Sequence, residues 1–337
     1  MYNDDDLRSA VDAGIFSEEA AAAFRHHLAG RTAAAATAPA GSPDEENFRL
    51  VTGFNDIFVV IACALLLVAI AWIVAAVSSI GAGLVATSAV SWGLAEFFTR
   101  RRHLALPSIF LLLTFAACLF AGSATFLPEG VAGLTVSAAI TAAATWFHWR
   151  RFRVPISVAA GAGALVGGVI ALLVLAIPAL ENGLPLLMIA AGLAVFALAM
   201  RWDSTDTLRQ TGRSDVAFWL HLLAAPLIVH PVFTTLGIYG GRGSLAQTAT
   251  VAVLYLMIAL VSLAIDRRAL MVSALAYVLY AFSSLFKTFG MVSIGFALTG
   301  LAVGSALLLL SAFWQQSRAA VLRYFPESLQ SRLPPSR

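Results

Sequence analysis

The sequence predicts an all-α fold, a polytopic transmembrane helix bundle of about ten spans with both termini in the cytoplasm. Of its 337 residues, 60% are hydrophobic and 12% are charged, and the mean hydropathy is +0.87. Such a composition is expected when most of the protein surface faces lipid. About fifty polar residues are followed by ten apolar stretches of 17 to 24 residues, and positive charge gathers in every second gap between them.

The distribution of positive charge predicts the topology. Of the 21 positively charged residues, all but Arg242 and Lys287 lie before the first stretch, in alternate gaps, or in the tail. Loops on the cytoplasmic side of a membrane carry an excess of Lys and Arg. We therefore expect these gaps and both chain termini to be cytoplasmic. Because the positive residues are spread over several loops, lipid headgroups explain them better than a nucleic-acid partner does.

The first 56 residues are predicted to be a small cytoplasmic domain and its connection to the membrane. Residues 1–30 have the pattern of a helical hairpin, in which Gly14 closes the first helix and Ser17 begins the second. Residues 31–56 contain first a linker rich in Ala, Thr, Pro and Gly and then a segment with Phe48, Val51 and Phe54 at three-residue spacing. This last segment suits a helix in the membrane interface.

The hairpin also carries a family resemblance. Leu7 and Val11, followed by the run from Gly14 to Glu18 ahead of many spans, resemble the N-terminus of an uncharacterised family of predicted bacterial integral membrane proteins. The resemblance covers roughly the first thirty residues and the general layout. It implies a bacterial inner-membrane location and supplies no activity.

The bundle is predicted to occupy residues 57–314, followed by an interfacial cytoplasmic tail at 315–337. Each apolar stretch can cross a hydrocarbon core of about 30 Å. Several Trp residues, among them Trp314, fall at predicted span ends, where indole rings favour the headgroup layer. The predicted spans are 57–77, 79–98, 104–122, 131–147, 154–177, 184–200, 216–237, 245–265, 269–286 and 291–314.

A polar stripe runs along the ninth predicted span. Its members are spaced so that they occupy one sector about 80° wide on a helix. They either bond to neighbouring helices or line a polar cavity with a lysine at its outer mouth. The stripe consists of Ser273, Tyr277, Tyr280, Ser284 and Lys287.

The seventh predicted span carries two histidines and two prolines. Pro226 and Pro231 each remove a backbone donor, so we expect the helix to bend. His221 and His230 are nine residues apart and point to opposite sides of a straight helix. Ionisable groups at membrane depth are a functional hypothesis by default. Either these histidines handle a proton or ligand, or each makes one hydrogen bond inside the bundle.

Enzyme, metal and cofactor signatures are missing from the sequence. It contains no HExxH, GxSxG or GxxxxGK motif. Cys63 and Cys118 lie inside apolar stretches, where a thiol acts as a small hydrophobe. Glu96 is expected to pair with Arg100 one turn later, and the Asp residues beside Arg in the loops are expected to fasten those loops.

Two functions from different classes remain open. One is the passive or proton-coupled movement of a small solute, lipid or ion along a path between the seventh and ninth spans. The other is a non-transporting membrane scaffold or regulator whose N-terminal hairpin docks a cytoplasmic protein partner. Fold class decides neither.

The charge distribution generates a topology prediction. Reporter fusions after Arg102, Arg153, Arg213 and Arg268 should report a cytoplasmic location, because each follows a basic gap. Fusions near Glu129, Glu181 and Arg242 should report the opposite side. One robust inversion in this series contradicts the ten-span topology.

Overall fold

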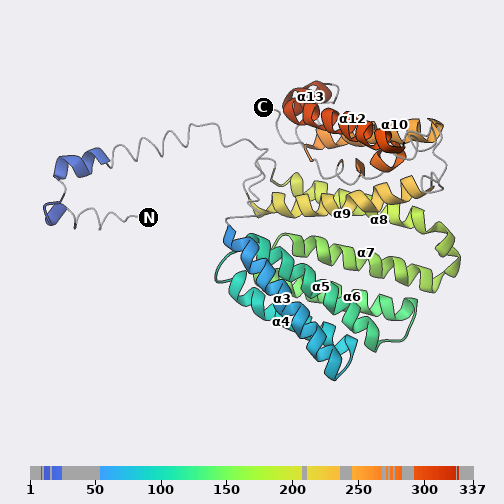
Figure 1. The fold of residues 1–337 in the computed structure, drawn as a ribbon, viewed down its shortest axis with the longest axis horizontal. Helices are drawn as coiled ribbons and strands as arrows, with labels where there is room; N and C mark the ends of the chain where they lie inside the picture. Colours follow the sequence, from blue (N-terminus) through green and yellow to red (C-terminus); the bar gives the residue numbers. More distant parts are fainter. Residues whose placement is uncertain are drawn as a thin grey trace. The chain divides into compact units, whose positions relative to one another are not determined.

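The computed structural model of the protein describes an all-α chain. It covers residues 9, 11–15, 17–24, 54–206, 211–235, 245–267, 271, 274–275, 278–282, 292–323 and 325. Across those residues there is no β-strand. The chain divides into two compact units, Met1–Glu46 and Asn47–Arg337, and the second contains all the long helices labelled in Figure 1.

The first unit contains the two features predicted from its sequence. Gly14 has a φ of 71°, and its N–H bonds to the carbonyl of Val11, which closes the first helical segment. The backbone N–H of Ala20 donates to Ser17 Oγ at 3.1 Å, so Ser17 caps the second helix as expected. Between them the side chain of Ile15 is 71% exposed.

The second unit is a succession of long apolar helices. Within the described residues, eight helices are long and apolar enough to cross a membrane, which indicates a multi-pass membrane protein. The helices are α3 (Phe54–Val77), α4 (Ile80–Phe98), α5 (Ala105–Phe126), α6 (Val131–Phe152), α7 (Ile156–Ala176), the 3-10 helix η1 (Pro178–Gly183), α8 (Leu184–Asp203), α9 (Gly212–Thr235), α10 (Leu245–Ile265), α12 (Val292–Ala312) and α13 (Trp314–Leu322).

These bounds follow the predicted apolar stretches to within five residues at each end, and two of the C-terminal extensions carry charged side chains. The prediction ended two spans at residues 147 and 200, but α6 continues to Phe152 and α8 to Asp203. A helix need not end where the apolar run ends, because charged side chains extend from a helix end into the headgroup layer. The ninth predicted span, 269–286, is helical at each of its described residues but lies largely outside them.

Consecutive helices joined by the Arg-rich turns pack most closely. These pairs are α4 with α5, α6 with α7, and α8 with α9 (Figure 1). The first two turns are short and contain residues with left-handed backbone, His103 at φ 54° and Arg153 at φ 56°. Glycines allow the closest approaches: a Cβ on Gly83 would lie 2.5 Å from the Ala71 carbonyl of α3, and one on Gly192 would lie 2.7 Å from Ile228 of α9.

The contact at Gly83 generates a stability prediction. Gly83→Ala should lower the free energy of unfolding by about 1–3 kcal/mol, because its methyl group collides with backbone rather than with a movable side chain. Gly93→Ala, in the same helix with nothing within 4 Å, is the matched control. It should be neutral or stabilise by up to about 1 kcal/mol. Thermal unfolding of the purified proteins in detergent measures both, and equal effects at the two sites would contradict the close packing of α3 on α4.

Candidate functional site

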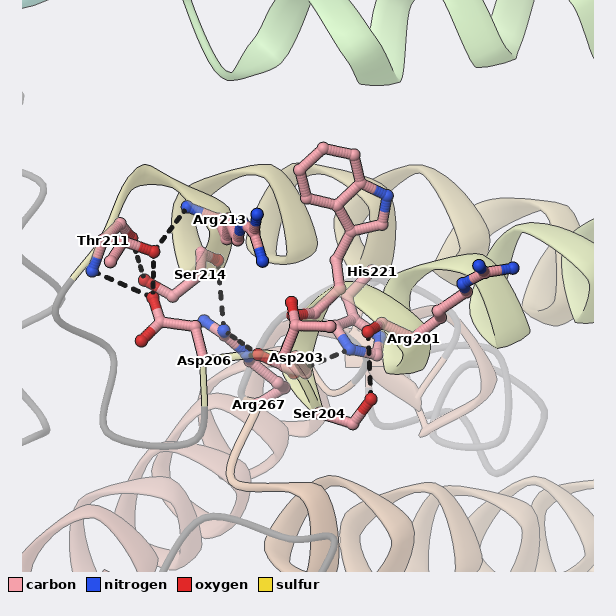
Figure 2. A network of polar contacts seen from close by, with 11 residues as sticks. Arg201, Asp203, Ser204, Asp206, Thr211, Arg213, Ser214, His221 and Arg267 are labelled. Carbon is pink, nitrogen blue, oxygen red and sulfur yellow. Dashed lines mark hydrogen bonds and ion pairs between the residues drawn. The ribbon is translucent and has the colours of Figure 1, made fainter.

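A charged cluster joins the ends of three helices. Arg267, just after α10, makes a bidentate contact with Asp203 at the end of α8, with Nη2 2.5 Å from Oδ1 and Nε 3.1 Å from Oδ2. His221 Nε2 of α9 lies 3.2 Å from the same oxygen, Asp203 Oδ2. The guanidinium also donates to the backbone carbonyl of Ser214 at 3.1 Å. Figure 2 shows Arg267 and His221 both pointing toward Asp203, with Arg267 also reaching Ser214.

This cluster is enclosed by protein. Arg267 is 2% exposed, Asp203 is 4% exposed and His221 is 0% exposed. A buried charge is costly unless it is paired and hydrogen bonded, and the fork geometry of Arg matches a carboxylate. The imidazole of His221 also contacts the ring of Phe196 edge-on, with centroids 5.2 Å apart. The cluster therefore fixes the ends of α8, α9 and α10 with respect to one another.

The turn after α10 also attaches α13, the last helix that the structure describes. The Ser262 hydroxyl donates to the Arg267 carbonyl, and Asp266 adopts a left-handed φ of 58°. Trp314 Nε1, at the start of α13, donates to Asp266 Oδ1 at 2.7 Å, and Arg318 Nε lies 3.9 Å from the same oxygen. The indole of Trp314 is thus buried in protein and satisfied by a carboxylate, and its predicted place in the headgroup layer stays a prediction.

A third carboxylate fastens the connection from α8 to α9. Asp206 Oδ2 accepts from the backbone N–H of Thr211 at 2.9 Å and from its hydroxyl at 2.6 Å (Figure 2). The Ser214 hydroxyl, in the first turn of α9, donates to the Thr211 carbonyl at 3.0 Å. The expectation that loop aspartates fasten their loops is confirmed here, whereas Asp203 joins separate helices.

An apolar pocket of about 300 Å³ lies beside the cluster, between α8, α9 and α10. The pocket forms because the backbone of α10 lies farther from α8 and α9 than these two helices lie from each other. Phe196 lines the pocket and also contacts His221, so the two features share a wall. Half-exposed side chains at the rim show that the pocket opens sideways from the bundle. The lining residues are Leu193, Phe196, Ile228, Val229, Val232, Phe233, Leu254, Met257, Ile258 and Val261.

The structure separates the two histidines of the predicted polar path. His221 is buried against Asp203, whereas His230 is exposed on the opposite face of α9. Pro226 and Pro231 lie inside α9, which continues through both to Thr235. Tyr280 is 37% exposed. The other stripe residues, Ser273, Tyr277, Ser284 and Lys287, lie outside the described residues, so the path as a whole stays a prediction.

Glu96 lies closer in space to Arg151 than to Arg100, the partner that the sequence predicts. Arg151 of α6 holds both carboxylate oxygens, with Nε 2.8 Å from Oε1 and Nη2 3.1 Å from Oε2. The predicted partner Arg100 is also in contact, at 3.5 Å. All three side chains are partly exposed, and ion pairs of this kind contribute little to stability. We therefore assign Glu96 a structural role between α4 and α6.

Comparisons with protein-family models, with curated proteins and with solved structures found no match to this chain. In the part of the chain that the structure describes, no group of three or more His, Cys, Asp or Glu side chains could hold a metal ion. The buried cluster and its neighbouring pocket are thus the features that carry the functional interpretation.

The charge cluster generates a prediction for a double-mutant cycle. Arg267→Met should cost about 3–5 kcal/mol of unfolding free energy, because it leaves the buried Asp203 carboxylate without its bidentate partner. Adding Asp203→Leu should recover most of that loss, because the double variant buries no unpaired charge. Denaturation of the detergent-solubilised protein measures each step.

Glu96→Gln is the control for this cycle, since it breaks an exposed ion pair and should cost at most about 1 kcal/mol. If the double variant is as unstable as Arg267→Met alone, the cost does not arise from an uncompensated buried charge.

Proposed function

We propose that this protein is a transporter-like multi-pass protein of the bacterial inner membrane that moves a lipid by accepting its acyl chain between α8, α9 and α10. The single observation that carries this proposal is the apolar pocket of about 300 Å³ beside the buried charge cluster. The N-terminal resemblance and the charge distribution support the location and the cytoplasmic termini.

The chemistry of the pocket selects the class of ligand. All ten lining side chains are aliphatic, aromatic or thioether. An ion, a sugar or another polar solute would lose its hydration there without gaining hydrogen bonds. The volume lies at the lower end of the range for small-molecule pockets, which suits part of a flexible chain. Because the pocket opens sideways through α8 and α10, an acyl chain can enter it directly from the bilayer.

The charge cluster determines how the pocket can widen. Arg267, Asp203 and His221 hold α8, α9 and α10 together at one end, one to two helical turns from the pocket. Farther along, α10 packs on α9 through side chains, in the apolar cluster that includes Val229, Phe233 and Val251. Separating the helices there breaks dispersion contacts, whereas separating them at the cluster breaks a buried ion pair. The charge cluster of Arg267, Asp203 and His221 therefore acts as a hinge. The end of the pocket farther from this cluster is the part that opens.

One observation favours the scaffold alternative. The N-terminal unit exposes the large apolar side chain of Ile15 at the turn between its two helical segments. Together with Phe24, which is 41% exposed in the same unit, it supplies exposed apolar surface through which a protein partner would bind. Deletion of residues 1–43 separates the two functions, since lipid movement should persist and partner binding should be lost.

The proposed function predicts protein-dependent lipid movement. Vesicles of phosphatidylcholine and phosphatidylglycerol that contain the purified protein and a fluorescent phospholipid should lose outer-leaflet and then inner-leaflet signal on addition of dithionite. Val261→Trp should slow the second phase by roughly tenfold, because the indole fills a pocket of about 300 Å³. Val253→Trp is the matched control on α10, exposed and outside the pocket lining, and should leave the rate unchanged.

Two outcomes would contradict the proposal. One is a rate no faster than in protein-free vesicles, with the protein shown to be folded after reconstitution. The other is equal rates for Val261→Trp and the unsubstituted protein, which would place any lipid path elsewhere.

A further inference from the structure

A second pocket, chemically unlike the first, lies between two neighbouring Arg-rich turns. It has a volume of about 200 Å³ and is lined by the α4–α5 turn, the α6–α7 turn and one side chain of α9, Trp219. The lining combines polar and basic groups with apolar ones, and includes Thr99, His103, Ser108 and Arg153.

Two helix N-termini meet at this pocket. Ala105 is the first residue of α5 and Ile156 the first residue of α7, and both line it. Neither helix has a side-chain cap, since the residues before them are Leu104 and Pro155. The first N–H groups of a helix have no partner within that helix, and the helix dipole places about half a positive charge at each N-terminus. Together they favour an anion.

The charge that lines the pocket is positive and comes from Arg153. Arg153 and His103 are basic, and no Asp or Glu lines it. The guanidinium of Arg153 lies over the ring of Trp149, 5.6 Å from its centroid, which holds the side chain near the turn. Arg153 and His103 are both exposed, so the pocket can be reached from outside the helices.

Thr99 supplies an observation independent of the helix ends. Its side chain lines the pocket and is 8% exposed. Within the described structure its hydroxyl has no hydrogen-bond partner, although most buried hydroxyls have one. By contrast, Ser108 on the same wall is satisfied by the Leu104 carbonyl at 2.5 Å. Thr99 thus brings to the pocket lining a hydroxyl that no described protein group satisfies.

We propose that this pocket binds a phosphate group, either the headgroup phosphate of an anionic lipid or a free phosphate. The anion would accept from the N–H groups of Ala105 and Ile156, the first residues of α5 and α7, from the Thr99 hydroxyl and from Arg153. Phosphate suits this arrangement because several acceptor oxygens on a small anion can meet donors from several directions. The site is separate from the apolar pocket, and it does not depend on whether the protein moves lipids.

The test measures binding through the thermal unfolding of the full chain in an uncharged detergent. Inorganic phosphate, phosphatidic acid and phosphatidylcholine are added separately at constant ionic strength. Stabilisation by phosphate and phosphatidic acid supports a site open to free phosphate, and stabilisation by phosphatidic acid alone supports a headgroup site. Phosphatidylcholine should have the smallest effect, since its headgroup carries no net charge.

Variants assign the effect to this pocket. Arg153→Asn removes the charge but tolerates the left-handed backbone, and should weaken the apparent affinity by about tenfold. Arg102→Asn is the matched control: it removes the same charge from the adjacent turn, where Arg102 lies over Phe97 outside the pocket, and should change affinity less than about twofold.

Thr99→Val keeps the side-chain shape and should also weaken binding, which a purely electrostatic surface effect would not produce. The proposal is overturned if none of the three additions stabilises the protein, or if Arg153→Asn and Arg102→Asn weaken binding equally.

Discussion

The pairing of Arg267 with Asp203 is the constraint on which the second half of the bundle depends. The two side chains are 64 positions apart in sequence and both are almost completely buried. Removing two charges from water is expensive, and only good geometry with further hydrogen bonds offsets that cost. His221 and the Ser214 carbonyl provide those bonds. Since Asp203 ends α8 and Arg267 follows α10, the pairing sets where α10 lies even though its backbone packs loosely on α8 and α9.

This arrangement explains why the apolar pocket lies where it does. The earlier helices approach each other through glycines, at Gly83 against α3 and at Gly192 between α8 and α9. Close approach of this kind leaves little space between helices. Helix α10 is held at its end by an ion pair and along its length by large side chains such as Phe233 and Leu254. A helix fixed at one end and packed through bulky residues elsewhere leaves a gap on its side, and the pocket occupies that gap.

Local features of the structure could be predicted from the sequence because they depend on local physics. Span length follows from bilayer thickness, and the cap at Ser17 and the turn at Gly14 follow from the chemistry of single residues. The opposite directions of His221 and His230 follow from helical periodicity. The charge cluster could not be predicted in this way. An Asp beside an Arg in a loop suggests a local pair, and the sequence holds nothing that would choose Arg267 over the nearer Arg201 as the partner of Asp203. The bond from Trp314 to Asp266 could not be predicted for the same reason, since the two residues are 48 positions apart.

Helix α9 connects the two proposed sites. Trp219 lines the basic pocket between the α4–α5 and α6–α7 turns, and His221 belongs to the charge cluster. Residues two positions apart on a helix face nearly opposite directions. Any shift or rotation of α9 therefore changes both surroundings at once. Binding of an anion in the basic pocket would favour the placements of α9 that preserve that pocket, and would bias the charge cluster by the difference in anion affinity between those placements and the others. Such coupling is reciprocal. If phosphate changes the affinity for a ligand between α8, α9 and α10, that ligand changes the affinity for phosphate by the same factor. An amphipathic lipid offers both chemistries, a phosphate and an acyl chain, which makes α9 the element through which the membrane could act on both sites.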